Sequence, residues 1–219
     1  MVVNFIRVRQ GHQIGRRVGR SLPSVLSVEI CAARPSDRPA VESVVAAAFE
    51  EEVEGRTVGL VRALDASGAT RASLVAVSGD GVVGHVQLSR SWLDTRSALV
   101  EVLVLSPLSV RPDRQGAGVG TALVAAALAE AERLGAPAVF LEGAWEYYGR
   151  RGFSAAAPLG FAPPSARIPE PAFQAALLPA YEPWMTGALV YCEAFWVQDC
   201  VGLRDPLLAQ VEERVQRDG

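Results

Sequence analysis

One short stretch of this chain combines the residue types that bind phosphate groups. It follows a long apolar run, opens a helical pattern, and consists of Gln115, Gly116, Ala117, Gly118, Val119, Gly120 and Thr121. Glycine lets a ligand approach the backbone closely, and the first N–H groups of a helix have no partner inside it. Because the helix dipole also favours negative charge there, the stretch predicts a binding site for a pyrophosphate or a similar anion.

The composition excludes several other chemistries. All 21 basic residues are arginine, so a P-loop lysine and a Schiff-base lysine are both excluded. The dinucleotide fingerprint G-x-G-x-x-G/A fails in both registers, because Thr121 or Leu123 stands where a small residue is needed. His12 and His85 are far apart, and none of the three cysteines forms a C-x-x-C pair, so no metal site or hydrolase triad is expected. The odd number of irregularly spaced cysteines indicates a reducing, cytoplasmic setting, and no apolar stretch is long enough to span a membrane.

The elements that position the glycine stretch can be predicted from hydrophobic periodicity and turn residues. Strands are expected at 28–32, 73–77, 82–88, 98–110, 138–141 and 188–192, and helices at 35–48, 58–64, 121–134, 145–150 and from 205 onward. Gly79, Asp80 and Gly81 predict a hairpin turn between two of these strands. His85 lies within the resulting antiparallel meander, where we expect a hydrogen-bonded core histidine.

Two motifs in this order resemble the GNAT superfamily of acetyl-coenzyme A-dependent N-acyltransferases. The first is Arg/Gln-x-x-Gly-x-Gly/Ala after a strand that ends in a Val-x-Pro-like turn, here Val110 to Gly120. The second places a tyrosine five residues before the phenylalanine of a Gly-Phe end, here Tyr148 in the segment from Ala144 to Phe153. The resemblance covers roughly residues 27–161 and extends more weakly to Trp196. It implies an α/β (α+β) fold with a mixed, mostly antiparallel sheet, splayed central strands and flanking helices.

The resemblance also implies a cofactor and roles for particular residues. Acetyl-coenzyme A would be the co-substrate, with backbone groups of the splayed strand around Leu108 and Val110 on its pantetheine arm. The loop residues from Gln115 to Thr121 would hold the pyrophosphate, and Arg114 and Arg151 would contact phosphates, since guanidinium suits phosphate geometry. Tyr148 would be the general acid for the leaving thiolate, and the alternative is a tyrosine packed under the loop.

The resemblance implies a general base on the same strand, at a position that aligns near Leu105. The carboxylate that this strand offers is Glu101, which lies on the same face but about 13 Å away by the usual strand rise. Glu142 at the end of the next strand, or an acid between Glu50 and Glu54, is an alternative. A base is unnecessary if the amine arrives neutral.

These observations predict one acetyltransferase domain with two extensions. Residues 1–26 form a basic extension with five arginines and no acid, residues 27–199 the domain, and residues 200–219 a C-terminal helix. The domain has a core at 27–161 and an acceptor-side segment at 162–199. The expected activity is transfer of an acetyl group from acetyl-CoA to a primary amine of a small molecule or peptide, by direct attack in a ternary complex. The alternative is a noncatalytic acyl-CoA-binding regulatory or interaction module; no nucleic acid or membrane is expected as a partner, and a homodimer is compatible with the sequence.

Overall fold

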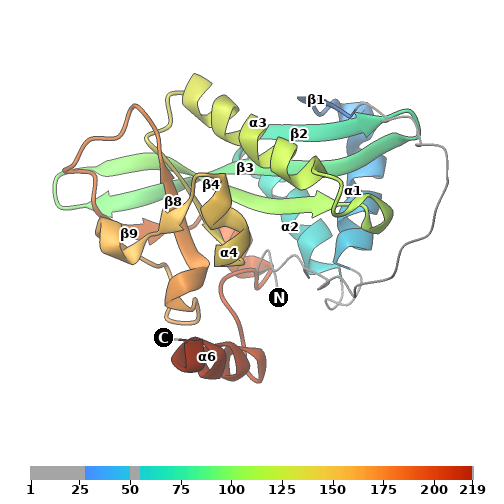
Figure 1. The fold of residues 1–219 in the computed structure, drawn as a ribbon. Coiled ribbons are helices and arrows are strands. Elements are labelled where there is room, and N and C mark those ends of the chain that lie inside the picture. The colour runs from blue at the N-terminus through green and yellow to red at the C-terminus, as the bar shows by residue number, and fades with distance from the viewer. Residues whose placement is uncertain (1–27, 50–54, 219) are drawn as a thin grey trace.

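The structure is a computed structural model that describes residues 28–49 and 55–218. The expected basic extension at 1–26 and the acidic cluster from Glu50 to Glu54 lie outside the described residues. Figure 1 shows a central sheet with helices on both faces and the C-terminal helix at one end of the molecule. Among the described helices, none has the length and apolar character that a membrane span requires.

Within residues 28–49 and 55–218 the sheet contains nine strands, and most of its pairs are antiparallel. Its main path runs β1-β2-β3-β4-β5-β8-β6, while β9 pairs with both β3 and β7. The strands are β1 (Glu29–Ala32), β2 (Thr70–Ser78), β3 (Gly81–Thr95), β4 (Leu99–Val110), β5 (Ala138–Glu142), β6 (Ser154–Ala155), β7 (Phe161–Ala162), β8 (Phe173–Leu177) and β9 (Gly187–Val190). The pairs β4–β5 and β7–β9 are parallel. The predicted mixed, mostly antiparallel sheet is therefore confirmed.

The helices divide the core into layers on the two faces of the sheet (Figure 1). Helix α3 (Val119–Arg133) covers one face, and Leu123 of this helix packs in one cluster with Leu103 and Leu105 of β4. Side chains alternate along a strand, so Val102 and Val104 face the other layer. That layer contains α2 (Arg56–Ala66) and α5 (Glu193–Val197), with α1 (Arg38–Ala48) beside α2. The remaining helices are α4 (Trp145–Tyr148), α6 (Leu207–Asp218) and the short 3-10 turns η1 (Pro35–Asp37), η2 (Pro112–Arg114), η3 (Gly149–Arg151), η4 (Ala157–Leu159) and η5 (Glu170–Ala172).

Several local predictions are confirmed in detail. The hairpin between β2 and β3 turns at Gly79 and Asp80, directly before Gly81. His85 is fully buried, and its Nε2 lies 3.0 Å from the Ser73 hydroxyl. Burial lowers the pKa of His85 to about 4, so this histidine is a neutral core residue.

The acceptor-side segment at 162–199 contains a strand that the sequence analysis did not predict. Strand β8 pairs antiparallel with β5 over its whole length and lies between β5 and β6 in the sheet. Phe173 at its start stacks on Phe140 with ring centroids 5.8 Å apart, and Phe161 packs edge-on against the same ring at 4.9 Å. Part of the segment therefore completes the sheet and its core.

Candidate active site

The central parallel pair of strands is joined over only a short distance. Strands β4 and β5 pair at two successive positions, starting with Leu103 opposite Val139. Beyond this contact β4 continues as far as Val110, whereas β5 ends at Glu142. The two strands therefore separate at their carboxyl ends, and the candidate active site lies at this separation.

The glycine-rich loop follows β4 directly and is held against its end. The Gln115 side chain donates a hydrogen bond to the Val110 carbonyl at 3.1 Å, which ties the loop to the last residue of the strand. Gly116 and Gly118 have φ angles of 77° and 87°. These are left-handed conformations that strain other residues, so the loop requires glycine at both positions. No heavy atom lies within 4 Å of a Cβ built at either residue, so a ligand can approach the backbone there.

The loop presents a row of backbone donors at the start of α3. Within the described chain, the N–H groups from Gly116 to Thr121 donate no hydrogen bond, whereas Ala122 N–H donates to the Gly118 carbonyl at 3.0 Å. The helix is 15 residues long and places its positive dipole end at these donors. These backbone donors have the arrangement that the predicted anion cradle requires.

Arg151 lies against the same helix start. Its guanidinium donates to the Thr121 hydroxyl, with the two nitrogen–oxygen distances at 3.1 and 2.7 Å, and also to the Tyr147 carbonyl. The guanidinium carbon is 3.5 Å from the centre of the Tyr147 ring, a cation–π contact. A Cβ built at Gly120 would lie 2.5 Å from the Tyr147 hydroxyl, so this ring covers the first turn of α3. Arg151 and Tyr147 together form one wall of the cradle.

Arg114 is nearer to the loop in sequence, but its charge is already paired. It donates to Asp80 in the β2–β3 turn at 2.6 Å, and Arg111 donates to the same carboxylate. These two contacts hold the pKa of Asp80 well below its usual range. The structure therefore brings Arg114 to the loop as part of a salt-bridge cluster with Asp80 and Asp113.

Tyr148, the predicted general acid, is fully buried on α4. Its ring packs edge-on against Phe153 and Tyr147, at centroid distances of 5.8 and 5.0 Å, and it belongs to the same core cluster as Leu105 and Leu108 of β4. Its hydroxyl has no hydrogen-bond partner within the described chain. Burial raises the pKa of Tyr148 well above its ordinary value, so the hydroxyl keeps its proton at neutral pH.

A small cavity lies where β4 and β5 separate. It is lined by Val104 and Ser106 of β4, by Glu142 at the end of β5, and by three residues of the C-terminal segment, Tyr191, Phe195 and Cys200. Ser106 precedes Pro107 in a bulge of β4, opposite Gln87 of β3. The cavity places a carboxyl group directly beside the separated part of β4.

Glu142 is the buried acid of this cavity. Its Oε2 accepts a hydrogen bond from Gly202 N–H at 2.9 Å, and its Oε1 has no hydrogen-bond partner within the described chain. Burial raises the pKa of Glu142 from 4.5 to about 7, while Tyr191, Gly202 and the more distant charge of Arg167 act in the opposite direction. A carboxyl with a pKa near neutrality can take up and release a proton under physiological conditions.

The structure places Glu101, the predicted base, at the other end of β4. It lies opposite Trp92 of β3, two residues before the contact with β5 begins. The carboxylate is 41% exposed and forms an ion pair with Arg71 at 2.8 Å. The structure thus brings the loop, Tyr148 and Arg151 together on the α3 side of the sheet, places Glu142 in a cavity of the opposite core layer, and leaves Glu101 outside both groups. Leu108 and Val110 lie on the separated part of β4, opposite Val86 and Gly84 of β3.

Sequence reasoning did not identify Tyr191, Cys200 and Gly202 as part of this site. They come from a segment that follows the motifs by about 40 to 50 residues, and no local pattern marks them. The glycine in Cys200-Val201-Gly202-Leu203 was the available signal. Gly202 has a φ of 61°, and a Cβ there would lie 2.6 Å from the Arg167 carbonyl.

Among the residues that the structure describes, no group of three or more His, Cys, Asp or Glu is arranged to hold a metal.

One family of transferases combines three of these features: two parallel strands that separate, a glycine-rich loop that opens a helix, and a following helix with a tyrosine. The pattern that defines the acetyltransferase (GNAT) family matches residues 39–153, and this chain belongs to that family.

Two solved structures and one curated sequence illustrate the similarity. YhbS of Escherichia coli, a GNAT family N-acetyltransferase solved in complex with CoA, is 26% identical with a TM-score of 0.70, over 80% of this chain and 96% of that one. A GNAT family acetyltransferase from Brucella melitensis in complex with acetyl-CoA is 31% identical with a TM-score of 0.63, over 77% and 98% of the two chains. The uncharacterized N-acetyltransferase YjhQ of Escherichia coli (strain K12) is 34% identical over an alignment of 110 residues, which covers 47% of this chain and 61% of that protein. The matched part thus spans less than two thirds of this curated relative.

Proposed function

We propose that this chain transfers an acetyl group from acetyl-CoA to a primary amine by direct attack in a ternary complex. The observation that carries the proposal is the row of unpaired N–H groups from Gly116 to Thr121 beside the separated strands. The donors suit a pyrophosphate, and the separation leaves room for an extended arm along β4. The CoA and acetyl-CoA in the structures of the two relatives support this choice of acyl donor.

The residues around the separation have types that suit the steps of the transfer. The amine must be deprotonated, and the Glu142 carboxylate is the base that we assign to this proton. The amine nitrogen then attacks the thioester carbonyl, the carbon–sulfur bond breaks, and the thiolate takes a proton from the Tyr148 hydroxyl. The second proton of the attacking nitrogen returns to the Tyr148 oxygen, and Glu142 releases the first proton to solvent. The products are the acetamide and free CoA thiol. The cradle and Arg151 position the donor, which supplies much of the rate enhancement in a reaction between two bound molecules.

The experiment that tests this function uses two matched glycine variants of α3. Gly118 precedes the helix and Gly135 follows it; both have positive φ, 87° and 73°, and neither has a heavy atom within 4 Å of a built Cβ. Gly118→Glu puts a carboxylate into the cradle, whereas Gly135→Glu imposes a comparable backbone strain at the other end of the helix. Calorimetry with acetyl-CoA should show binding by the wild type and Gly135→Glu, and none by Gly118→Glu.

Thiol release in the presence of a panel of amines then separates an enzyme from a binding module. Amine-dependent release from the wild type supports catalysis. Binding of acetyl-CoA without release for any amine would favour the noncatalytic module, and the absence of binding would overturn the assignment of the cradle.

A further inference from the structure

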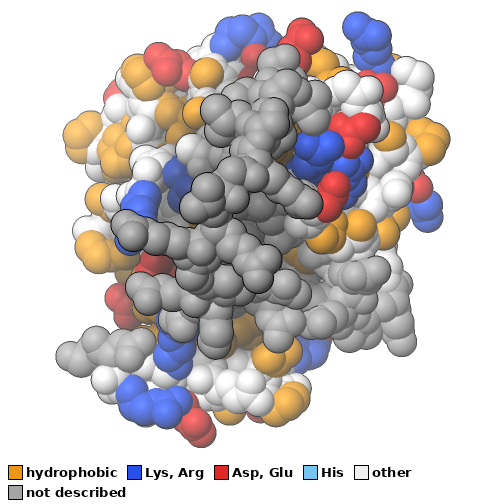
Figure 2. Space-filling model, turned by 45° about the vertical axis from the view of Figure 1, so that its right-hand side comes forward, with side chains coloured by type: hydrophobic (Ala, Val, Ile, Leu, Met, Phe, Trp, Pro, Cys, Tyr) orange, Lys and Arg blue, Asp and Glu red, His pale blue; other side chains and the backbone are white. Residues whose placement is uncertain are grey.

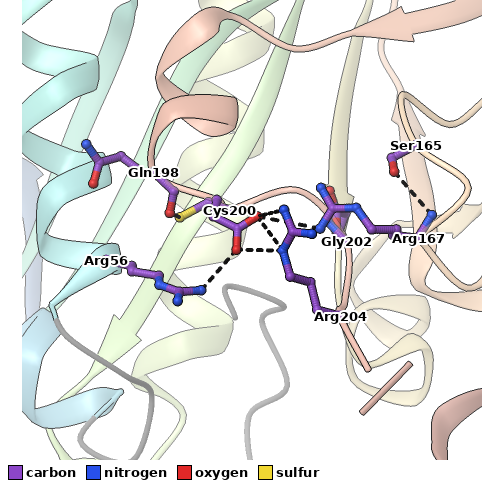
Figure 3. A network of polar contacts seen from close by, with 9 residues as sticks. Arg56, Ser165, Arg167, Gln198, Cys200, Gly202 and Arg204 are labelled. Atoms are coloured by element: carbon purple, nitrogen blue, oxygen red, sulfur yellow. Dashed lines mark hydrogen bonds and ion pairs between the residues drawn. The ribbon is translucent and has the colours of Figure 1, made fainter. Parts of the chain in front are cut away.

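Three arginines from separate parts of the chain surround one aspartate beside the candidate site (Figure 3). Asp199 forms ion pairs with Arg56 of α2 at 3.1 Å, with Arg204 at 2.7 Å and with Arg167 at 3.6 Å. We call these four residues the arginine cluster. In Figure 3, Arg56 lies on one side of the network, and Arg167 and Arg204 lie on the other.

The arginine cluster carries more positive charge than it neutralises. Within the described chain, no second carboxylate forms an ion pair with Arg56, Arg167 or Arg204, so these three guanidiniums share one carboxylate there. The Nη1 atom of Arg167 is buried and makes no hydrogen bond, because its distance to Asp199 is too long. One arginine partner would be enough for Asp199 to anchor its segment of the chain. The guanidinium donors of the other two arginines suit an incoming anion.

The cluster is joined to Glu142 by a few residues of backbone. Cys200, which lines the cavity, directly follows Asp199. Gly202 N–H donates to the Glu142 carboxyl, and Leu203 N–H donates to the Arg167 carbonyl at 2.8 Å. The charge of Arg167 acts on the pKa of Glu142, which shows that the two groups are within electrostatic range. An acceptor molecule at the cavity therefore has the cluster as its neighbour.

We propose that the arginine cluster binds an anionic group of the acceptor, so that the substrates of this chain are amines that also carry a carboxylate or a phosphate. The inference rests on the proposed function and deepens it, because it names the class of acceptor. Asp199 holds the three guanidiniums together, and their planar, charged donors bind the acceptor anion. The amine of the same molecule then lies toward Glu142. Guanidinium geometry suits both carboxylate and phosphate, so the test includes one acceptor of each kind.

The test compares amines that carry an anionic group with amines that lack one; these are called the charged and the neutral amines below. β-Alanine is paired with propylamine, and O-phosphoethanolamine with ethanolamine. The proteins are the wild type, Arg204→Gln, Arg56→Gln and the control Arg62→Gln, whose arginine lies on α2 like Arg56 but pairs with Glu42 at 2.9 Å. For each protein, KM for the amine is measured by thiol release, and the unfolding midpoint is measured with saturating CoA, with and without the amine.

The wild type should have the lower KM for the charged member of at least one pair, and that amine should raise its unfolding midpoint. Removing one charged contact should raise this KM about tenfold in Arg204→Gln and Arg56→Gln. KM for the neutral amines and for acetyl-CoA should stay unchanged, and Arg62→Gln should behave as the wild type. Preference for β-alanine or for O-phosphoethanolamine identifies the anion as carboxylate or phosphate.

Two results would overturn the inference. One is thiol release with equal KM for charged and neutral amines in the wild type, and the other is a preference that both variants retain. Failure of the proposed function looks different, because acetyl-CoA then fails to bind or no amine releases thiol. In that case the unfolding midpoints decide: a rise with a charged amine that both variants lose supports the anion site, and no rise in the wild type refutes it.

Discussion

Replacing Glu142 by glutamine tests the assignment of the base most directly. Glutamine has nearly the same shape, and its amide can still accept the hydrogen bond from Gly202, but it cannot take the proton of the amine. We expect Glu142→Gln to lower kcat by about 10²- to 10⁴-fold, the usual contribution of a positioned general base. Binding of acetyl-CoA, measured by calorimetry, should be retained, because the cradle lies on the loop and α3.

The pKa of Glu142 determines how strongly the activity should depend on pH. Because burial raises the pKa of Glu142 to about 7, the carboxylate form falls tenfold per pH unit below neutrality. At pH 5 about one hundredth of the molecules hold the ionised base, so kcat/KM should be roughly a hundredfold below its plateau. The limb near pH 7 should be absent from Glu142→Gln, while a limb at higher pH from the amine itself should stay.

Stability should depend on pH for the same reason, with a definite sign. The folded pKa of Glu142 lies above the ordinary value of 4.5, so the folded state holds its proton more tightly than the unfolded state. Relative to the glutamine variant, the wild type should therefore lose stability as pH rises from about 4.5 through about 7. The full difference between the two pKa values corresponds to about 3 kcal/mol, and denaturant unfolding of both proteins at pH 4.5 and pH 8 measures it.

A limb near pH 7 that persists in Glu142→Gln would refute the assignment of the base. If Glu101→Gln loses that limb instead, the general base is Glu101, the exposed acid on β4. A difference in stability that does not change with pH would show that Glu142 is not buried in its neutral form.

Three further substitutions test the surrounding groups. Tyr148→Phe should lower kcat by about 100-fold or more, because the general acid is lost. Stability should change little, because the hydroxyl has no partner within the described chain. Unchanged kcat in thiol-release assays would make Tyr148 a packing residue. Arg151→Gln should raise KM for acetyl-CoA about tenfold while leaving KM for the amine unchanged, and equal effects on both substrates would contradict its place at the cradle. Gly202→Ala should strain a backbone with positive φ and place a Cβ 2.6 Å from the Arg167 carbonyl oxygen. The unfolding midpoint should therefore fall, and the limb of the pH profile near pH 7 should shift. A variant with the wild-type midpoint and pH profile would mean that this loop adjusts without cost.

The donor side of the site could be predicted from sequence because its signals are local. The loop, the start of α3 and the tyrosine helix lie within about 40 residues, and each is marked by residue types with strong conformational preferences. The positive φ angles of Gly116 and Gly118 are the physical basis of the motif. The β2–β3 turn at Gly79 and Asp80 could also be predicted, because its residue types locally mark a turn.

The acceptor side could not be predicted because its parts meet only through long-range packing. Strand β8 reads Phe-Gln-Ala-Ala-Leu and lacks the β-branched alternation typical of a strand, yet pairing with β5 buries its first four residues. Glu101 and Glu142 are both acids on central strands, and sequence spacing alone favoured the first. The short β4–β5 contact separates them in space, since it ends at Phe140, two residues before Glu142, and leaves Glu101 at the opposite end of β4.

The hydrogen bond between Gly202 and Glu142 spans 60 residues of sequence, and this separation has a consequence for the order of assembly. Contacts between distant residues close late, because the chain between them must first be ordered. On a ribosome the loop, α3 and the tyrosine helix emerge well before residue 202. We therefore expect that a nascent chain can bind the proposed acyl donor before Gly202 reaches Glu142, the proposed base.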